Sequence, residues 1–322
     1  MSPSVNKSSN RWPIAVICLS VLAACGGGGD LPEGSKVSVV GGIATVGPAN
    51  GAAVTPPNGA SSSTAGTASL PAGQTDANAT SCFNPTLFRL GSTRIIEMKA
   101  TYGTQGTAEL QSSTTVGETT LYRNTNVGVV TETENSLPDK KFEASGAPTK
   151  ITVTRRYVTT DQNTQSVLLY GSTANSTPLN NSSGATISDI AYNPNFQTRF
   201  SLKYGSSYTQ AYDKSNRTTN SDGTSSESST TNNLTTLFVG VESITVPGGT
   251  FKACRFEETG TSVLKLSGQA AKTNQSPQVT RWYGVKNGLL LKSVLVTSPL
   301  NAAENQVEEF VSGVINGVAV TP

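Results

Sequence analysis

Apolar and polar residues alternate along much of the chain beyond residue 81, and this pattern predicts β-strands. Between residues 96 and 102 the even positions are apolar, whereas the odd positions hold Glu, Lys and Thr. A period of two also occurs over 151–157, 196–204 and 264–266. Because successive side chains on a strand point to opposite faces, each segment fits a strand with one buried face.

Turn-forming residues separate these segments and complete the prediction of an all-β fold. They occur at 161–163, 221–223, 247–249 and 286–288, where Gly, Asn, Asp and Pro favour tight chain reversals. We expect a single large antiparallel, curved sheet, as a half-barrel or open barrel, with few or no helices. Residues 301–310 fit either one short helix or a last strand.

The first 25 residues predict export and a lipid anchor. Residues 1–12 carry Lys7 and Arg11, and residues 13–24 form an apolar run. That run spans about 18 Å as a helix, too short to cross a bilayer but suited to a signal peptide. Its last residues and Cys25, the sequence Leu-Ala-Ala-Cys, resemble the lipobox of bacterial lipoproteins.

The lipobox resemblance implies cleavage after residue 24 and a membrane anchor on the acylated Cys25. In that family Asp after the cysteine favours the inner membrane, so Gly26 implies the outer membrane. The alternative is an ordinary secretory signal that ends beside a chance cysteine.

Composition divides the exported chain into a linker and one β-domain. Between residues 26 and 80 there is no aromatic residue, and Gly and Pro occupy 31% of positions, which is typical of a flexible linker. We therefore expect a signal peptide at 1–24, a lipidated linker at 25–80 and an antiparallel β-domain at 81–322. Within the linker, residues 37–46 fit a small hairpin.

Two cysteines remain in the predicted domain, Cys82 and Cys254. An even number in an oxidising compartment predicts a disulfide between them. The alternative is a pair of buried thiols. The bond would join the start of the domain to a strand near its end.

Two motifs near the C-terminus resemble a broad group of poorly characterised bacterial envelope proteins. Residues 246–251 read Val-Pro-Gly-Gly-Thr-Phe, and 282–292 read Trp-Tyr-Gly-Val-Lys-Asn-Gly-Leu-Leu-Leu-Lys. The group has Val-Pro-Ala-Gly-Thr-Phe followed by a Trp-Tyr motif, and its sheets are curved and antiparallel. The resemblance covers about 60 residues and carries over no catalytic residue.

Composition excludes several kinds of chemistry. The chain has no histidine, which removes Ser-His-Asp, Cys-His and His-ligated metal mechanisms. Without Lys7 and Arg11, 21 basic residues face 21 acidic ones, so a nucleic-acid partner is not expected. The Ser-x-x-Lys at 262–265 lies on a predicted strand, where its ends face opposite ways. We therefore assign no catalytic, cofactor-binding or metal-binding residue.

Aromatic residues supply one candidate ligand site. Phe196, Phe200 and Tyr204 begin a series that recurs every four residues up to Tyr212. On one uninterrupted strand all would share a face, either as core or as the lining of an apolar cavity. Trp282 is a candidate for the same face.

These observations leave three function classes open. The first is a non-enzymatic outer-membrane lipoprotein that binds an apolar molecule or an envelope protein. The second is a hydrolase that uses carboxylates alone, such as a glycosidase, since that chemistry needs no histidine. The third is a structural or adhesive surface protein. A concave cluster of carboxyls with raised pKa would favour the hydrolase.

Overall fold

The computed structural model describes residues 36–40, 43–47, 78–103, 106–137, 150–179, 184–266, 270–297 and 305–322. The predicted signal peptide, Cys25 and most of the predicted linker lie outside these residues. The chain divides into two units, Met1–Ser62 and Ser63–Pro322, and each is described by itself.

The first unit contains a two-stranded antiparallel hairpin. Its strands are β1 (Lys36–Val40) and β2 (Ile43–Gly47). The pairing runs from Lys36 opposite Gly47 to Val40 opposite Ile43. The stretch at 37–46 thus forms the small hairpin that its sequence fits.

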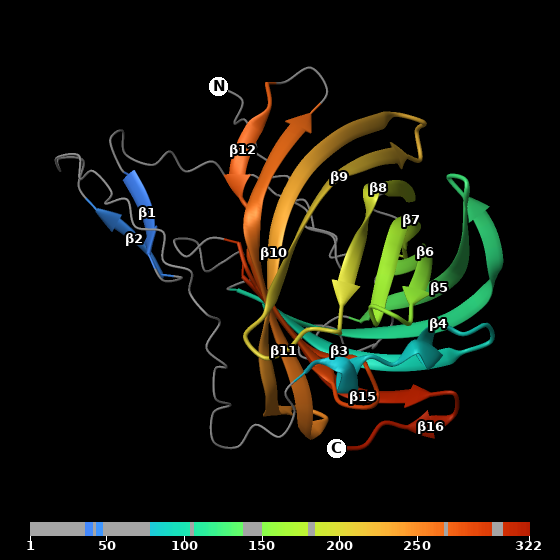
Figure 1. Cartoon of the computed structure of the whole chain (residues 1–322). Coiled ribbons are helices and arrows are strands. Elements are labelled where there is room, and N and C mark those ends of the chain that lie inside the picture. The colour runs from blue at the N-terminus through green and yellow to red at the C-terminus, as the bar shows by residue number, and fades with distance from the viewer. Residues whose placement is uncertain are drawn as a thin grey trace, which may run out of the picture. The chain divides into compact units, whose positions relative to one another are not determined.

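The second unit is one antiparallel sheet of 14 strands (Figure 1). The strands are β3 (Thr93–Tyr102), β4 (Gly106–Tyr122), β5 (Thr125–Leu137), β6 (Lys150–Asp161), β7 (Ser166–Pro178), β8 (Thr186–Arg199), β9 (Ser207–Asn220), β10 (Ser225–Val246), β11 (Gly249–Leu266), β12 (Lys272–Gln275), β13 (Gln278–Gly284), β14 (Leu290–Val296), β15 (Gln306–Ile315) and β16 (Val318–Ala319). Two short 3-10 helices, η1 (Thr80–Cys82) and η2 (Pro85–Phe88), precede them, and the described residues contain no α-helix.

The predicted all-β fold is confirmed, and its sheet closes into a barrel. Strands β3 to β10 pair in chain order, and β3 also pairs with β15. The order continues through β14 and β13 to β11, which pairs with β10 from Ser228–Leu266 to Val246–Gly249. Twelve strands therefore form a ring, with β12 and β16 attached outside it. Of the two alternatives for 301–310, the strand is correct, since β15 begins at Gln306.

Across the described residues, no helix has the length and apolar character needed to cross a membrane.

The alternation of side chains gives the ring an interior face and an outer face. Thr114, Glu132 and Thr154 lie side by side on β4, β5 and β6, and all three are buried. Their face is the interior. Val153, one residue away on β6, is 36% exposed and belongs to the outer face.

Residues 78–92 cross one end of the barrel, here called the entry end. Ala79 N–H donates to the carbonyl of Leu202, beyond β8, at 2.9 Å. Gly91 N–H donates to the carbonyl of Val116 on β4, also at 2.9 Å. Because three strands separate β8 from β4 in the ring, the segment spans part of the opening between these two contacts.

Two apolar clusters pack near the entry end. The first consists of Ala79, Cys82, Phe200, Leu202, Tyr208, Phe238, Val241, Cys254 and Phe256. The second consists of Leu87, Val246, Phe251, Ala253, Leu289, Leu291 and Phe310.

The turn between β10 and β11 builds the second cluster. Gly249 has φ of 128°, a conformation that glycine adopts readily. Gly248 N–H donates to the carbonyl of Phe310 at 3.0 Å, and the Phe251 ring meets that of Phe310 at 5.6 Å. The motif at 246–251 therefore joins the hairpin to β15, which is a structural role.

Candidate functional site

Cys82 and Cys254 form a disulfide in the structure, with their Cα atoms 6.2 Å apart. The bond joins η1 to β11 inside the first apolar cluster. It therefore fixes the segment that crosses the entry end to the wall of the barrel.

The aromatic series does not lie on one strand. Strand β8 ends at Arg199, and β9 begins at Ser207. Between them the chain reverses, with Ser206 N–H donating to the carbonyl of Lys203 at 2.9 Å. Tyr204 lies in this turn.

The reversal places Phe196 and Phe200 in different surroundings. The Phe196 ring meets the Tyr212 ring edge-on at 5.5 Å. Phe200 is 4% exposed and contacts the rings of Phe256 and Tyr283 at 5.7 and 5.2 Å. Phe200 is thus packed in the core beside the disulfide.

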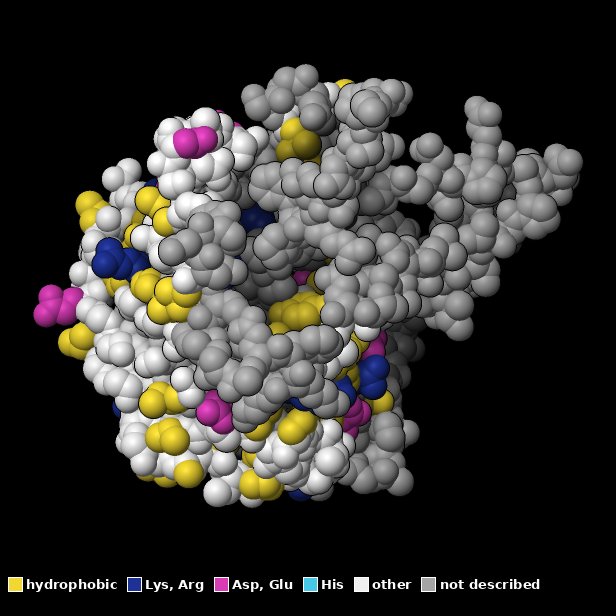
Figure 2. Space-filling view, turned by 180° about the vertical axis from the view of Figure 1, so that it is seen from behind, with side chains coloured by type: hydrophobic (Ala, Val, Ile, Leu, Met, Phe, Trp, Pro, Cys, Tyr) yellow, Lys and Arg dark blue, Asp and Glu magenta, His cyan; other side chains and the backbone are white. Residues whose placement is uncertain are grey.

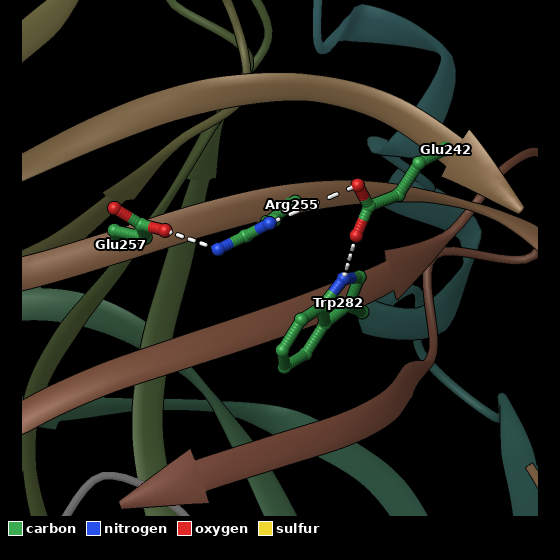
Figure 3. Close-up of polar contacts among 4 residues, drawn as sticks. All are labelled: Glu242, Arg255, Glu257 and Trp282. Carbon is green, nitrogen blue, oxygen red and sulfur yellow. Dashed lines mark hydrogen bonds and ion pairs between the residues drawn. The ribbon is translucent and has the colours of Figure 1, made fainter. Parts of the chain in front are cut away.

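Trp282 lies on the outer face, where it joins a polar network (Figure 3). Its indole N–H donates to Glu242 Oε1 at 2.6 Å, and Arg255 lies over the ring at 5.6 Å from its centroid. Arg255 also pairs with Glu242 and Glu257. The predicted shared face of Trp282 with Phe196 and Phe200 is wrong, because Arg281 occupies the interior position opposite Phe256.

The barrel interior carries ionisable side chains in place of the expected apolar lining. Glu132 pairs with Arg156, and Glu134 and Glu308 lie near them. Glu132, Glu134 and Glu308 are 6%, 8% and 6% exposed. Burial, helped by the charges of Glu132 and Glu308, raises the pKa of Glu134 from 4.5 to about 7.

Small neighbours provide the space for these groups. Glu134 is flanked by Ser112 and Thr152, and Glu132 by Thr114 and Thr154. None of these four side chains is long enough to fill the centre of the barrel.

A second buried ion pair lies closer to the aromatic rings. Arg281 Nη1 is 3.6 Å from Glu258 Oε2, and Glu258 Oε1 has no hydrogen-bond partner among the described residues. A cavity of about 10 Å³ lies beside this pair. That is close to the smallest space that holds one water molecule, which would satisfy the free oxygen.

A much larger hollow, here called the outer groove, lies on the outer face. Its volume is about 820 Å³. Its floor comes from β7 to β11, and its wall comes from Tyr122 and Arg123 at the turn between β4 and β5.

The β4–β5 turn closes one side of the outer groove because it folds against the neighbouring strands. Tyr122 stacks on Tyr157 of β6 at 4.1 Å between ring centroids. Its hydroxyl donates to the carbonyl of Ile190 on β8 at 3.5 Å. A Cβ on Gly171 would lie 2.2 Å from this hydroxyl, so only glycine leaves room for the ring.

The lining of the outer groove combines charged and hydroxyl side chains with the apolar groups of Tyr122, Ile190, Ala191 and Leu266. Arg217 and Glu227 form an ion pair at 3.7 Å. Among the ion pairs of the described residues, none involves Arg123, Asp189 or Lys265, which also line the groove. Elsewhere charges of both signs are interspersed on uncharged surface, as Figure 2 shows for one face.

The described residues contain no group of three acidic or cysteine side chains placed to hold a metal ion.

No family model matches the sequence, and no curated protein matches it. Three solved structures are similar. The first is described as an exported protein with a YmcC-like fold from Bacteroides fragilis. It is 13% identical over 69% of this chain and 95% of its own, with a TM-score of 0.33.

The second is described as a lipoprotein of Parabacteroides distasonis, 12% identical over 72% of this chain and 96% of its own, with a TM-score of 0.33. The third, the hypothetical lipoprotein YmcC of Escherichia coli, is 14% identical over 69% and 87%, with a TM-score of 0.23. At these TM-scores the similarities carry no argument about function.

Proposed function

We propose that the protein is a lipoprotein anchored in the bacterial outer membrane through Cys25, with a barrel that binds a ligand in the outer groove. The anchor is supported by Leu-Ala-Ala-Cys at 22–25 behind a basic segment and an apolar run. The binding role is carried by the outer groove, whose volume of about 820 Å³ lies within the usual range for ligand sites.

The ligand is polar. The groove presents hydroxyls and the charges of Arg123, Asp189 and Lys265, which take part in no ion pair within the part of the chain that the structure describes. An apolar molecule would remove water from these groups without replacing its hydrogen bonds, which costs free energy. A polar ligand therefore replaces the apolar molecule that the sequence suggested.

Binding is a better account of the described residues than hydrolysis. The raised pKa of Glu134 is the feature expected of a carboxylate hydrolase. However, Glu132, Glu134 and Glu308 are all more than nine-tenths buried, and Glu132 is held by Arg156. Side chains so placed do not reach a substrate in the outer groove, which contains none of them.

The anchor is tested by Cys25→Ser and membrane fractionation. We expect the wild-type protein in the outer-membrane fraction and the variant in the soluble periplasmic fraction. An unchanged distribution would refute the anchor.

The binding site is tested by filling the groove. Ser229 is exposed on its floor, so Ser229→Trp should occlude it. Thr231→Trp, two residues along the same face of β10 and outside the groove, is the matched control. A panel of amino acids, peptides, sugars and nucleotides is screened by thermal denaturation, since a ligand that binds the folded state raises the midpoint. Shifts that Ser229→Trp abolishes and Thr231→Trp keeps support the site; shifts equal in both variants refute it.

A further inference from the structure

Two cationic side chains lie at opposite sides of the outer groove. Lys265 stands on β11, and the strand register leads from it across Ser229 and Ser215 to Ala191 on β8. Arg123 lies at the other side, on the β4–β5 turn. The residues that pair across the strands between the two cations, Ser229, Ser215 and Ala191, are therefore uncharged.

The distance between the sides follows from the sheet itself. Ala191 pairs with Gly171 on β7, which Tyr122 covers. From β11 to β7 there are four strand spacings, or about 19 Å. An extended peptide covers that distance in about six residues.

The middle of the groove holds Asp189 together with the ion pair of Arg217 and Glu227, so its net charge is negative. Asp189 lies in the next row of the outer face, where it pairs with Arg217 in the strand register. Arg217 itself forms an ion pair with Glu227 on the far side from Asp189. An anionic group at the centre of the groove would face Asp189, whereas one at either side would face a cation.

We propose that the outer groove binds an extended acidic peptide segment of an envelope partner, with one acidic side chain at Lys265, another at Arg123 and uncharged residues between them. This inference rests on the proposed binding function. The peptide N–H groups of the middle residues donate to Asp189, and the hydroxyls of Ser215 and Ser229 bind its carbonyls.

The aromatic residue of the groove favours a peptide over a sugar chain. An aromatic ring with a free face offers a large flat apolar area on which a sugar ring can pack. One face of Tyr122 is stacked on Tyr157, and Arg123 lies 5.7 Å from its ring centroid. The ring is thus already in contact with the protein, and the rest of the lining contains no second aromatic side chain.

The test uses capped hexapeptides and the full mature chain carrying Cys25→Ser, which keeps the protein free of lipid. The first peptide has glutamate at both ends and serine and glycine between. The second has the same composition with both glutamates in the middle, and the third has glutamine in place of glutamate. Isothermal titration measures the affinities at low and at 0.5 M salt, which screens exposed charges.

We expect the end-glutamate peptide to bind most tightly and the glutamine peptide most weakly. Lys265→Gln and Arg123→Gln should each weaken binding of the end-glutamate peptide about fivefold, the effect of one close charge pair in water. Lys252→Gln, which removes an exposed charge from the same strand outside the groove, should change nothing. Asp189→Asn should remove the preference for glutamates at the ends.

The outcomes separate this inference from the proposed function. Equal affinity for the three peptides, no binding at all, or an equal effect of Lys252→Gln would overturn the acidic peptide. Tighter binding of an acidic oligosaccharide such as tri-galacturonate would also overturn it. If groove-filling Ser229→Trp still abolishes binding of another ligand from the panel, the binding function stands and the peptide assignment alone fails.

Discussion

Replacing Glu134 with glutamine should stabilise the protein at alkaline pH and have little effect at acid pH. Glutamine keeps the size and shape of the side chain but does not ionise. In the barrel Glu134 faces two other carboxyls, Glu132 and Glu308, and two cations, Arg156 and Lys150. The variant therefore removes one titrating group and leaves its neighbours in place.

The magnitude follows from the pKa of Glu134 in the two states. The pKa is about 7 in the folded protein and has its ordinary value of 4.5 in the unfolded chain. Between these values the folded state holds a proton that the unfolded state has released, so the free energy of unfolding falls as the pH rises. Across the whole interval the loss is about 3 kcal/mol. Because the side chain is 8% exposed, solvent screening reduces this figure little.

Urea denaturation of the disulfide-bonded protein measures the effect at pH 5, 6, 7 and 8. The quantity of interest is the stability of Glu134→Gln minus that of the wild type, because titration of other groups cancels in this difference. It should grow by about 2.5 kcal/mol from pH 5 to pH 8, because part of the effect is already present at pH 5. Glu118→Gln, an exposed position on β4, is the control variant in the same assay.

A difference that stays constant for Glu134→Gln would refute the reasoning. It would mean that Glu134 is ionised in the folded state at every pH used, and that Arg156 and Lys150 outweigh burial and the two carboxyls. A difference that shrinks with rising pH would refute it more strongly, since the ionised carboxylate would then stabilise the fold.

Three further predictions test the packing. Gly171→Ala should lower the free energy of unfolding by about 1–3 kcal/mol, because the new methyl group meets Tyr122 and the carbonyl of Ile190. In the control Gly117→Ala, the atom nearest to the new methyl group is 3.6 Å away, so the same urea assay should show a loss of less than about 1 kcal/mol. Phe200→Ala should cost about 3–5 kcal/mol if the ring is core, and a loss under about 1 kcal/mol would show that it is not. Replacing both Cys82 and Cys254 with alanine should lower the free energy of unfolding by about 2–5 kcal/mol, and equal stability under oxidising conditions would contradict a stabilising bond.

The period of two predicted the fold class because it depends only on which residues alternate. Strand β3 follows it closely from residue 96 to residue 102. The closure of the ring had no such signal, because it depends on the pairing of β10 with β11 and of β3 with β15. The second of these pairings joins segments about 200 residues apart.

The site was harder to predict because polarity does not distinguish the two faces of several strands. On β5 the interior positions are Glu132 and Glu134, and the outer positions beside them are Thr131 and Thr133. Because both faces of β5 carry polar residues, the sequence suggests that solvent contacts both faces of this strand. Only the closed ring shows that one of these faces is buried.

The prediction that the aromatic series shares one face failed for a different reason. A spacing of four residues places side chains on one face only while the strand continues. The turn that contains Tyr204 ends β8 and begins β9, so Phe196 and Tyr212 meet by chain reversal. The outer groove could not be predicted either, because it depends on Tyr122 reaching β7 and β8 from a distant turn.

The disulfide also determines how the domain responds to mechanical force. If the protein hangs from a membrane by its N-terminal segment, tension enters the domain at Asn78 and reaches Cys82 within four residues. The covalent bond then passes the force to Cys254 on β11, so the rest of residues 78–92 need not resist it. Strand β11 is hydrogen-bonded to β10 over nearly its whole length, so the force reaches a strand with many hydrogen bonds. A force applied from the membrane side is therefore transmitted to β11 through the disulfide and does not detach residues 83–92 from the barrel.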